Sequence, residues 1–240
     1  MNRRTFLKTL PALGVLAGPV LSTAEGTATS FAQDLQPITL PKPDKEGGKS
    51  VLAALWERKT TRNISPEKLP MQVLSNLLWA AFGVNRENEP YGGPGRTAAT
   101  ASNSQEIDLY AALAEGVYLY EAVPHRLSPV AAGDFRARSG RRATAMAPVN
   151  IFYVVDLAKY SKAPFQEPGL KDSDVVKSYY YVATGLIAGN VYLFAASQGL
   201  ASHFHNCDKT NTPKDFKLRP EQRVLYAHTV GYPADGQAAR

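Results

Sequence analysis

The chain has 240 residues, of which 44% are hydrophobic and 20% are charged, a balance that suits a globular protein with a sizeable core. Its formal net charge is +6, but no run of five or six basic residues accompanies it, which argues against nucleic acid as a partner. A single cysteine, Cys207, excludes an intramolecular disulfide.

The first 32 residues have the composition of an export signal. Arg3 and Arg4 precede Phe6-Leu7-Lys8, and residues 10–21 then form a short apolar run. This run is too short to cross a bilayer unaided and is typical of the apolar region of a signal peptide. The paired arginines resemble the twin-arginine signal, which the export machinery reads as an address. An uncleaved apolar anchor is the alternative interpretation.

Export predicts a periplasmic or otherwise secreted mature chain. Small residues favour cleavage after Ala24 or after Ala32. Loss of residues 1–32 removes three basic residues and one acidic residue, so the net charge falls from +6 to +4. Residues 33–49 contain three prolines and two glycines, which predict an extended arm, and residues 50–240 then form the folded domain.

Two helices are expected after the arm. Ser50 can cap the first, whose apolar face is Val51, Leu52, Leu55 and Trp56. A basic, hydroxyl-rich segment, ERKTTRNIS, separates it from the second helix, which Pro66 and Pro70 precede and Gly83 ends. The predicted buried stripe of this second helix comprises Val73, Leu74, Leu77, Leu78, Ala81 and Phe82.

Strands are expected in the middle of the chain. A loop rich in glycine and proline, residues 85–96, leads to TAATASNSQEIDLYAAL at residues 97–113. Apolar residues alternate from Ile107 to Leu113, which predicts a half-buried strand. Residues 116–130 predict a hairpin with a turn near Pro124.

The second half of the chain alternates again between strand and helix. A short helix is expected near residues 134–138, and VNIFYVV at residues 149–155 predicts a central strand. Residues 172–198 predict a long helix that is apolar on most sides, as in a core or an oligomer interface. Two further strands, LASHFH and RVLYAHTVGY, complete one α+β domain.

The chain offers few candidates for catalytic side chains. His203 and His205 share one face of a predicted strand, but the sequence places no third ligand, so no metal site is predicted. Cys207 has no adjacent basic residue to lower its pKa. Motifs for a nucleophilic serine, a dinucleotide or a phosphate-binding loop are absent from the sequence. The catalytic residues therefore remain unassigned.

One segment suits an anionic ligand. Arg58, Lys59 and Arg62 flank Thr60 and Thr61 at the end of the first predicted helix. Guanidinium groups bind phosphate oxygens in pairs, and hydroxyls donate further hydrogen bonds, so the segment favours a phosphate monoester. A solvated basic turn is the alternative.

In order along the chain, these segments resemble the nitroreductase family of flavoproteins. The family's Arg-Arg-Ser-x-Arg is matched by residues 58–62, with Lys59 in place of a frequent arginine. Its Leu-x-x-Leu-Leu-Trp-Ala-Ala helix is matched by residues 74–81. Its Asn-x-Gln loop is matched by residues 103–105, and its Gly-Leu-Gly-x segment by residues 199–202.

Residues flanking the Asn-x-Gln loop are similar to the branch of azoline-oxidising dehydrogenases. Arg96-Thr97-Ala98 precedes that loop and Gln105-Glu106-Ile107-Asp108 follows it. Ala99-Thr100 stands where Pro-Ser is common in the family. The resemblance extends over residues 50–233, nearly the whole mature chain.

The resemblance implies a nitroreductase-like α+β fold, with a central, mainly antiparallel sheet flanked by helices, in an intertwined homodimer with FMN at the interface. The long apolar helix and the arm are the expected dimer elements. A basic residue near the C-terminus binds phosphate in the family, and here only Arg240 can do so. The residues expected to bind FMN are Arg58, Lys59, Thr60, Arg62, Asn103, Gln105, Leu200, Ala201 and Ser202.

The resemblance also implies the reaction class. Bound FMN carries the redox chemistry, so electrons pass by a ping-pong mechanism from an unidentified reductant to a small organic acceptor. The acceptor classes are quinone-like, nitroaromatic or azoline-like compounds. The alternative is a non-catalytic protein that binds flavin or another planar ligand on the same fold.

Overall fold

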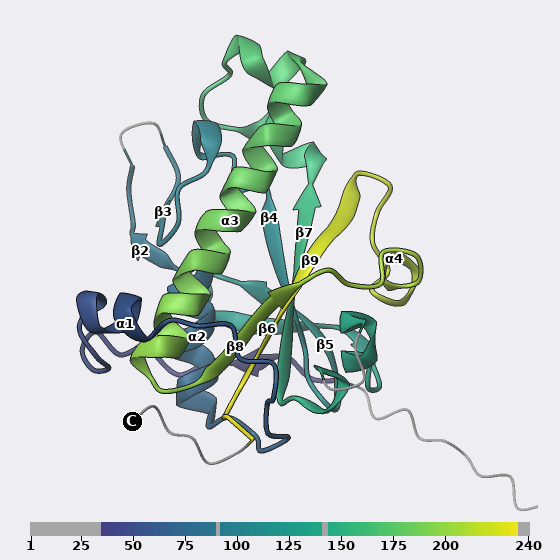
Figure 1. Ribbon diagram of the computed structural model, residues 1–240. Coiled ribbons are helices and arrows are strands. Elements are labelled where there is room, and N and C mark those ends of the chain that lie inside the picture. Colours follow the sequence, from purple (N-terminus) through teal and green to yellow (C-terminus); the bar gives the residue numbers. More distant parts are fainter. Residues whose placement is uncertain (1–34, 90–91, 141–143, 235–240) are drawn as a thin grey trace, which may run out of the picture. The chain divides into compact units, whose positions relative to one another are not determined.

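The computed structural model describes residues 35–89, 92–140 and 144–234 (Figure 1). The expected signal, residues 1–32, lies outside these residues, and the remainder of the chain, residues 33–240, forms one compact unit. No helix within the described ranges is both long and apolar enough to cross a membrane.

A seven-stranded sheet forms the centre of this unit, with the strand order β1-β6-β5-β4-β7-β9-β8 and antiparallel pairing throughout. This arrangement confirms the expected antiparallel α+β fold. The strands are β1 (Ile38–Thr39), β4 (Ile107–Ala112), β5 (Gly116–Glu121), β6 (Arg126–Ala132), β7 (Val149–Asp156), β8 (Ala201–His205) and β9 (Gln222–Gly231).

The middle of the sheet is buried on both faces. Every residue of β7 is buried, as the continuous apolar run predicted. β4 is also almost entirely buried, whereas its alternating pattern predicted one solvent-exposed face. The reason is that Tyr110 and Phe152 turn to the second face, where Phe216 covers them with ring centroids 5.8 and 4.9 Å away.

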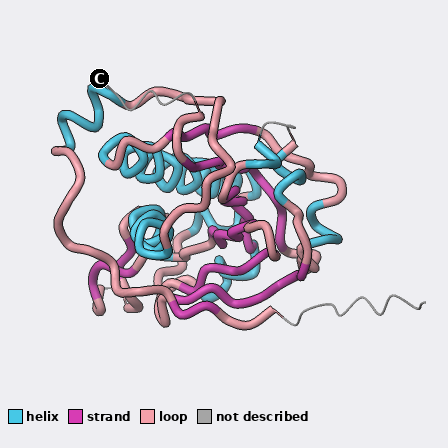
Figure 2. Tube along the Cα trace, turned by 90° about the horizontal axis from the view of Figure 1, so that it is seen from below, coloured by secondary structure: helices cyan, strands magenta, loops and turns pink. Residues whose placement is uncertain are grey.

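Helices α2 (Met71–Phe82) and α3 (Ser173–Ser197) cover the first face of the sheet. Leu77 and Leu78 of α2 are fully buried, in agreement with the predicted stripe, and Gly83 ends the helix. The Asp172 side chain caps α3 by accepting hydrogen bonds from the backbone N–H groups of residues 174 and 175. Figure 2, seen from below, shows the coils of the two helices next to each other beside the strands.

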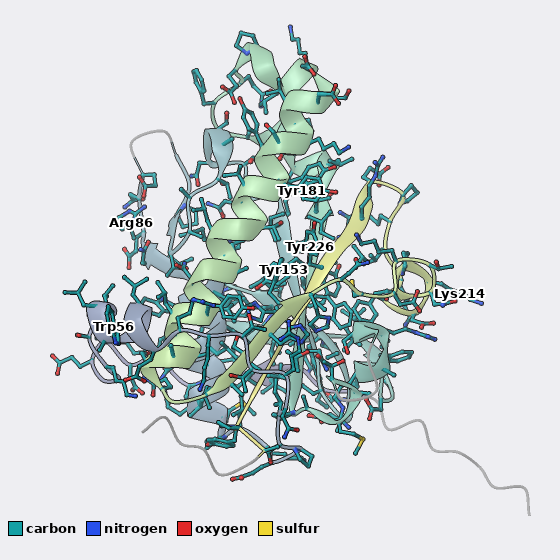
Figure 3. All side chains as sticks on the ribbon, viewed as in Figure 1. Trp56, Arg86, Tyr153, Tyr181, Lys214 and Tyr226 are labelled. Atoms are coloured by element: carbon teal, nitrogen blue, oxygen red, sulfur yellow. The ribbon has the colours of Figure 1, made fainter. Side chains whose placement is uncertain are left out.

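Helix α1 (Val51–Glu57) begins where the sequence predicted, because the Ser50 hydroxyl accepts a hydrogen bond from the Ala53 N–H at 3.3 Å. Its apolar face is exposed, however, and only Ala54 is buried. Trp56 is 92% exposed and Leu52 is 79% exposed. Figure 3 shows Trp56 on α1, away from the sheet. The apolar face of α1 therefore has no partner within the described part of this chain.

Shorter elements complete the fold. Part of the expected arm forms β1, which pairs with β6 at one edge of the sheet. Strands β2 (Val84–Arg86) and β3 (Gly95–Arg96) form a separate hairpin within the glycine-rich loop. The remaining elements are α4 (Thr212–Asp215) and the 3₁₀ helices η1 (Ala101–Asn103), η2 (Arg136–Ser139), η3 (Thr144–Met146), η4 (Leu157–Lys162) and η5 (Pro168–Lys171).

Candidate cofactor-binding site

The basic segment after α1 runs along the outer edge of β8. The Thr61 N–H donates a hydrogen bond of 2.9 Å to the Ser202 carbonyl. Farther along, the Ser65 N–H donates to the Tyr232 carbonyl, and the Ala234 N–H donates to the Asn63 carbonyl. Segment 58–62 is therefore held between the edge strand and the chain that follows β9.

The turn after α3 places the second group of expected FMN contacts, Leu200–Ser202, beside segment 58–62. Gly199 follows the helix with a φ of +68°, a left-handed conformation that glycine adopts without strain. The Leu200 N–H then donates to the Ala195 carbonyl at 2.8 Å, which closes the helix end. The turn brings Leu200, Ala201 and Ser202 next to segment 58–62.

Tyr192 connects the two groups. Its hydroxyl lies 3.0 Å from the Thr60 hydroxyl and accepts a 2.9 Å hydrogen bond from the Phe204 N–H. The Arg58 guanidinium lies over the Tyr192 ring, 5.4 Å from its centroid, which is a cation–π contact. The sequence analysis did not identify Tyr192. Its helix carries three further tyrosines, residues 179–181, so the sequence does not single it out.

A small cavity of about 80 Å³ lies between these groups. Lys59 lines it, while Arg58 and Arg62 are exposed on the same segment, and no ion pair within the described ranges includes any of the three. Cations without an acidic partner have N–H donors available for an anionic ligand. The cavity is lined by Glu57, Lys59, Thr61, Asn63, Tyr192, Ala195, Ala196, Gly199, Leu200, Ser202, Pro233 and Ala234.

The loop before β4 has an unusual backbone. Ser102, Asn103 and Gln105 have φ values of 54°, 49° and 49°. Such left-handed conformations are unfavourable for residues other than glycine and persist only where surrounding contacts hold them. One such contact is the 3.0 Å hydrogen bond from the Gln105 N–H to the Thr100 hydroxyl.

The two amides expected to bind flavin also hold this loop together. The Gln105 amide donates to the Pro94 carbonyl at 2.7 Å and to the Asn103 side-chain oxygen at 2.9 Å. The Arg96 guanidinium donates to the Gln105 side-chain oxygen at 2.7 Å. The Asn103 amide donates to the Gly92 carbonyl at 2.9 Å. Gln105 thus fixes the loop, while Asn103 lines the space beside it.

That space is a larger cavity of about 720 Å³. Arg96 is the most buried of its charged residues, and burial lowers the pKa of its guanidinium from the ordinary value. Arg86, which also lines this cavity, forms an ion pair with Glu89, so the lining has a net positive charge. The cavity is lined by Asn85, Arg86, Glu89, Gly95, Arg96, Thr97, Ala98, Ala99, Thr100, Ser102, Asn103 and Phe165.

The two groups of expected FMN contacts lie at different places in one chain. No residue lines both the small cavity beside segment 58–62 and the large cavity beside loop 100–105. In Figure 1, α1 lies near the C-terminal end of α3, whereas β3, which leads to the second cavity, lies farther along that helix. The described chain brings Arg58–Arg62 to Leu200–Ser202, but it does not bring Asn103 and Gln105 to them.

A buried acid, Glu106, follows directly after loop 100–105, which is expected to bind flavin. Glu106 has no exposed surface, and its carboxylate lies 2.7 Å from the Ser104 hydroxyl. Burial raises the pKa of the Glu106 carboxyl above its ordinary value, against smaller opposing effects of Ser104, Tyr160 and Lys159. Glu106 therefore binds its proton more tightly in the folded chain than in the unfolded chain.

The other candidate metal ligands and nucleophile lie in surroundings that suit a structural role. The His203 and His205 rings stack with centroids 4.5 Å apart, on one strand face as expected. Within the described ranges no group of three or more potential metal ligands comes together. Cys207 is buried, and burial raises the pKa of its thiol to about 12, which suppresses the reactive thiolate.

Comparisons with known proteins place this fold in the nitroreductase family. Residues 55–232 match the model of the nitroreductase family. The structure of a protein from Ralstonia eutropha JMP134 assigned to the nitroreductases is 31% identical, with a TM-score of 0.74, and the match covers 95% of this chain and 100% of that one. None of the curated proteins matches the chain.

Two more distant structures share the fold. The nitroreductase CinD from Lactococcus lactis, solved in complex with 4-nitrophenol, is 16% identical with a TM-score of 0.54, over 77% of this chain and 89% of that one. The microcin synthetase complex McbBCD from E. coli contains a chain that is 15% identical with a TM-score of 0.58, over 91% of this chain and 84% of that one.

Proposed function

The chain belongs to the nitroreductase family, and on that premise we propose that it is an exported, FMN-dependent oxidoreductase. The observation that carries this proposal is the basic segment 58–62 at the small cavity. Lys59 lines the cavity, and Arg58 lies over the ring of Tyr192, which also lines it. Within the described residues, Arg58, Lys59 and Arg62 form no ion pair with an acidic residue.

The residues present fit a phosphate monoester. Arg58, Lys59 and Arg62 supply positive charge, and Thr60, positioned by Tyr192, supplies a hydroxyl. Arg240, the basic residue expected to bind phosphate near the C-terminus, lies outside the described residues. Backbone groups of Leu200–Ser202 form the wall on which the rest of the cofactor lies.

We propose a homodimer because one chain leaves both an apolar surface and an incomplete site. A second group of exposed apolar residues, Tyr181, Val182 and Leu186, lies farther along α3. Groups of exposed apolar side chains typically mark a protein interface. A second subunit that covers these helices supplies its own loop 100–105, with Asn103, to the cofactor held by segment 58–62.

When bound, FMN supplies the capacity to accept and release two electrons together with a proton. Segment 58–62 would hold its phosphate and Leu200–Ser202 would hold the rest of the cofactor, with space for donor and acceptor to enter in turn. The large, positively lined cavity beside loop 100–105 is the proposed entry for a small acceptor of the quinone, nitro or azoline class. Residues 1–32 direct the loaded protein to the twin-arginine export machinery.

Reoxidation after chemical reduction tests turnover. Protein reconstituted with FMN is reduced with dithionite without oxygen and then mixed with menadione or with a nitrofuran. An oxidoreductase passes electrons to at least one acceptor much faster than the same concentration of free FMN. If reoxidation is no faster than that of free FMN with either acceptor class, the protein binds flavin without turning over.

A further inference from the structure

A chain of three side chains leads from the core of the sheet to the small cavity. The Ser202 hydroxyl lies 2.6 Å from His228 Nε2, and His228 Nδ1 lies 3.0 Å from the Tyr153 hydroxyl. The three residues come from β8, β9 and β7, and the strand register places them on the face that α3 covers. Figure 3 shows Tyr153 behind α3, at the centre of the sheet.

His228 is neutral in this position. It has no exposed surface, and burial, followed by the nearby His205 and His203, lowers the pKa of His228 well below its ordinary value. A neutral imidazole carries one proton on one of its two nitrogens. The hydrogen-bond polarity of the whole chain therefore depends on which nitrogen holds that proton.

Tyr153 determines which nitrogen of His228 holds the proton. Its side chain is fully buried, and within the described ranges its hydroxyl has one hydrogen-bond contact, with His228 Nδ1. A buried hydroxyl proton without an acceptor is unfavourable, so the Tyr153 proton is donated to Nδ1. The His228 proton then resides on Nε2 and is donated to the Ser202 oxygen. The Ser202 proton is left available for the cavity that Ser202 lines.

We propose that Tyr153 and His228 act as positioning residues that fix the Ser202 hydroxyl as a hydrogen-bond donor toward an anionic phosphate oxygen in the small cavity. The inference deepens the proposed function, because it names a group that recognises the phosphate of FMN. A ligand that presents only N–H donors to Ser202 would face the donating Ser202 hydroxyl, donor against donor, and would bind poorly.

The tautomer of His228 can be measured without any ligand. Long-range ¹H–¹⁵N correlation spectra of histidine-labelled protein at pH 7 are expected to show His228 protonated on Nε2 and bare on Nδ1. The His228 signals are expected to shift on addition of FMN or of inorganic phosphate, and this shift is expected to disappear in Ser202→Ala. Protonation on Nδ1, or a spectrum insensitive to both ligands, would overturn the proposal.

Ligand affinities complete the test. Ser202→Ala is expected to lower the affinity for FMN about tenfold. The affinity for riboflavin, which lacks the phosphate, is expected to stay nearly unchanged. Tyr153→Phe is expected to weaken FMN in the same selective way and to redistribute the His228 proton. Tyr120→Phe is the matched control, because the Tyr120 hydroxyl lies 3.0 Å from His125 Nδ1, outside this site.

The two proposals fail in different ways. If FMN binds and His228 carries its proton on Nδ1, the positioning role is wrong and the flavin function stands. If neither FMN nor riboflavin binds, the flavin function itself fails. An equal loss of affinity for FMN and for riboflavin in Ser202→Ala would show that Ser202 is part of the cavity wall and does not bind the phosphate.

Discussion

The hydroxyl of Thr60 lies 3.0 Å from the hydroxyl of Tyr192, although 132 positions separate the two residues in the chain. This contact joins the basic segment after α1 to the last turns of α3. Because the Phe204 N–H also donates to Tyr192, one side chain fixes the segment, the helix and the edge strand relative to each other. The proposed phosphate site is therefore built into the packing of the fold.

The first prediction concerns the cations. Arg58→Ala removes one charged donor, and a hydrogen bond to a charged group contributes about 1.5–3 kcal/mol. We expect FMN affinity, measured by flavin fluorescence titration, to fall about ten- to a hundredfold. The control is Arg126→Ala, which removes an exposed arginine paired with Glu121 on β5. Unchanged affinity in Arg58→Ala would place the phosphate elsewhere.

The second prediction concerns assembly. Trp56→Glu places a charge on the exposed face of α1, and central interface aromatics commonly contribute about 2 kcal/mol or more. We expect sedimentation velocity to show a dimer for the unmodified mature protein and a monomer for the variant at low micromolar concentration. Val123→Glu is the control, because Val123 is 70% exposed on the turn between β5 and β6 and should leave the dimer intact.

A dimer that survives Trp56→Glu and the equivalent change Leu186→Glu on α3 would contradict this interface. Loss of FMN together with loss of the dimer would support the contribution of loop 100–105 from the second subunit. Retention of FMN by the monomer at full affinity would show that one chain holds the complete cofactor site.

The third prediction is a pH dependence of stability. Burial raises the folded-state pKa of Glu106 above its ordinary value of 4.5, so the folded chain binds this proton more tightly than the unfolded chain. The stabilising effect is fully present below pH 4.5 and is lost as the pH rises through the raised value. Glu106→Gln stays neutral at every pH, so its free energy of unfolding should exceed that of the unmodified protein by about 1 kcal/mol near pH 7.

Urea unfolding at pH 4 and pH 7 measures this difference, which should shrink at the lower pH. Glu115→Gln changes an exposed carboxylate near the start of β5 and supplies the baseline. A constant difference between Glu106→Gln and the unmodified protein at both pH values would show that folding does not shift the pKa of Glu106.

The fourth prediction concerns export. Replacement of both Arg3 and Arg4 by lysine should retain the protein in the cytoplasm, because the twin-arginine machinery reads the paired arginines. Lys8→Arg keeps the local charge and should leave export unchanged. Cell fractionation and N-terminal sequencing are the measurements, and a mature chain should begin at Glu25 or at Gln33. Export of the double variant at the normal level would exclude this route.

Periodicity was sufficient to predict the elements that bury a regular apolar face. The stripe of α2, the length of α3 and the central position of β7 all follow from residue spacing. Spacing could not show what covers an apolar face. The four apolar residues of α1 predict a helix, but nothing local indicates that they remain exposed.

The site was predictable only where its residues lie close in sequence. Segment 58–62 shows its cations and hydroxyls directly. Tyr192 reaches the cavity, and His228 reaches Ser202, through helix and strand packing that no local pattern encodes. The left-handed backbone at Ser102 and Asn103 was equally invisible, because no glycine marks it. Separation of the two groups of expected contacts became evident only in three dimensions.

The central claim is that the mature chain binds FMN at segment 58–62, and an absorption spectrum tests it most directly. The protein is purified after export, its visible spectrum is recorded, and the released chromophore is identified by mass after denaturation. We predict the bands of an oxidised flavin, released as FMN at close to one per chain, and a marked loss of these bands in Arg58→Ala. A colourless protein that takes up no added FMN would contradict the account.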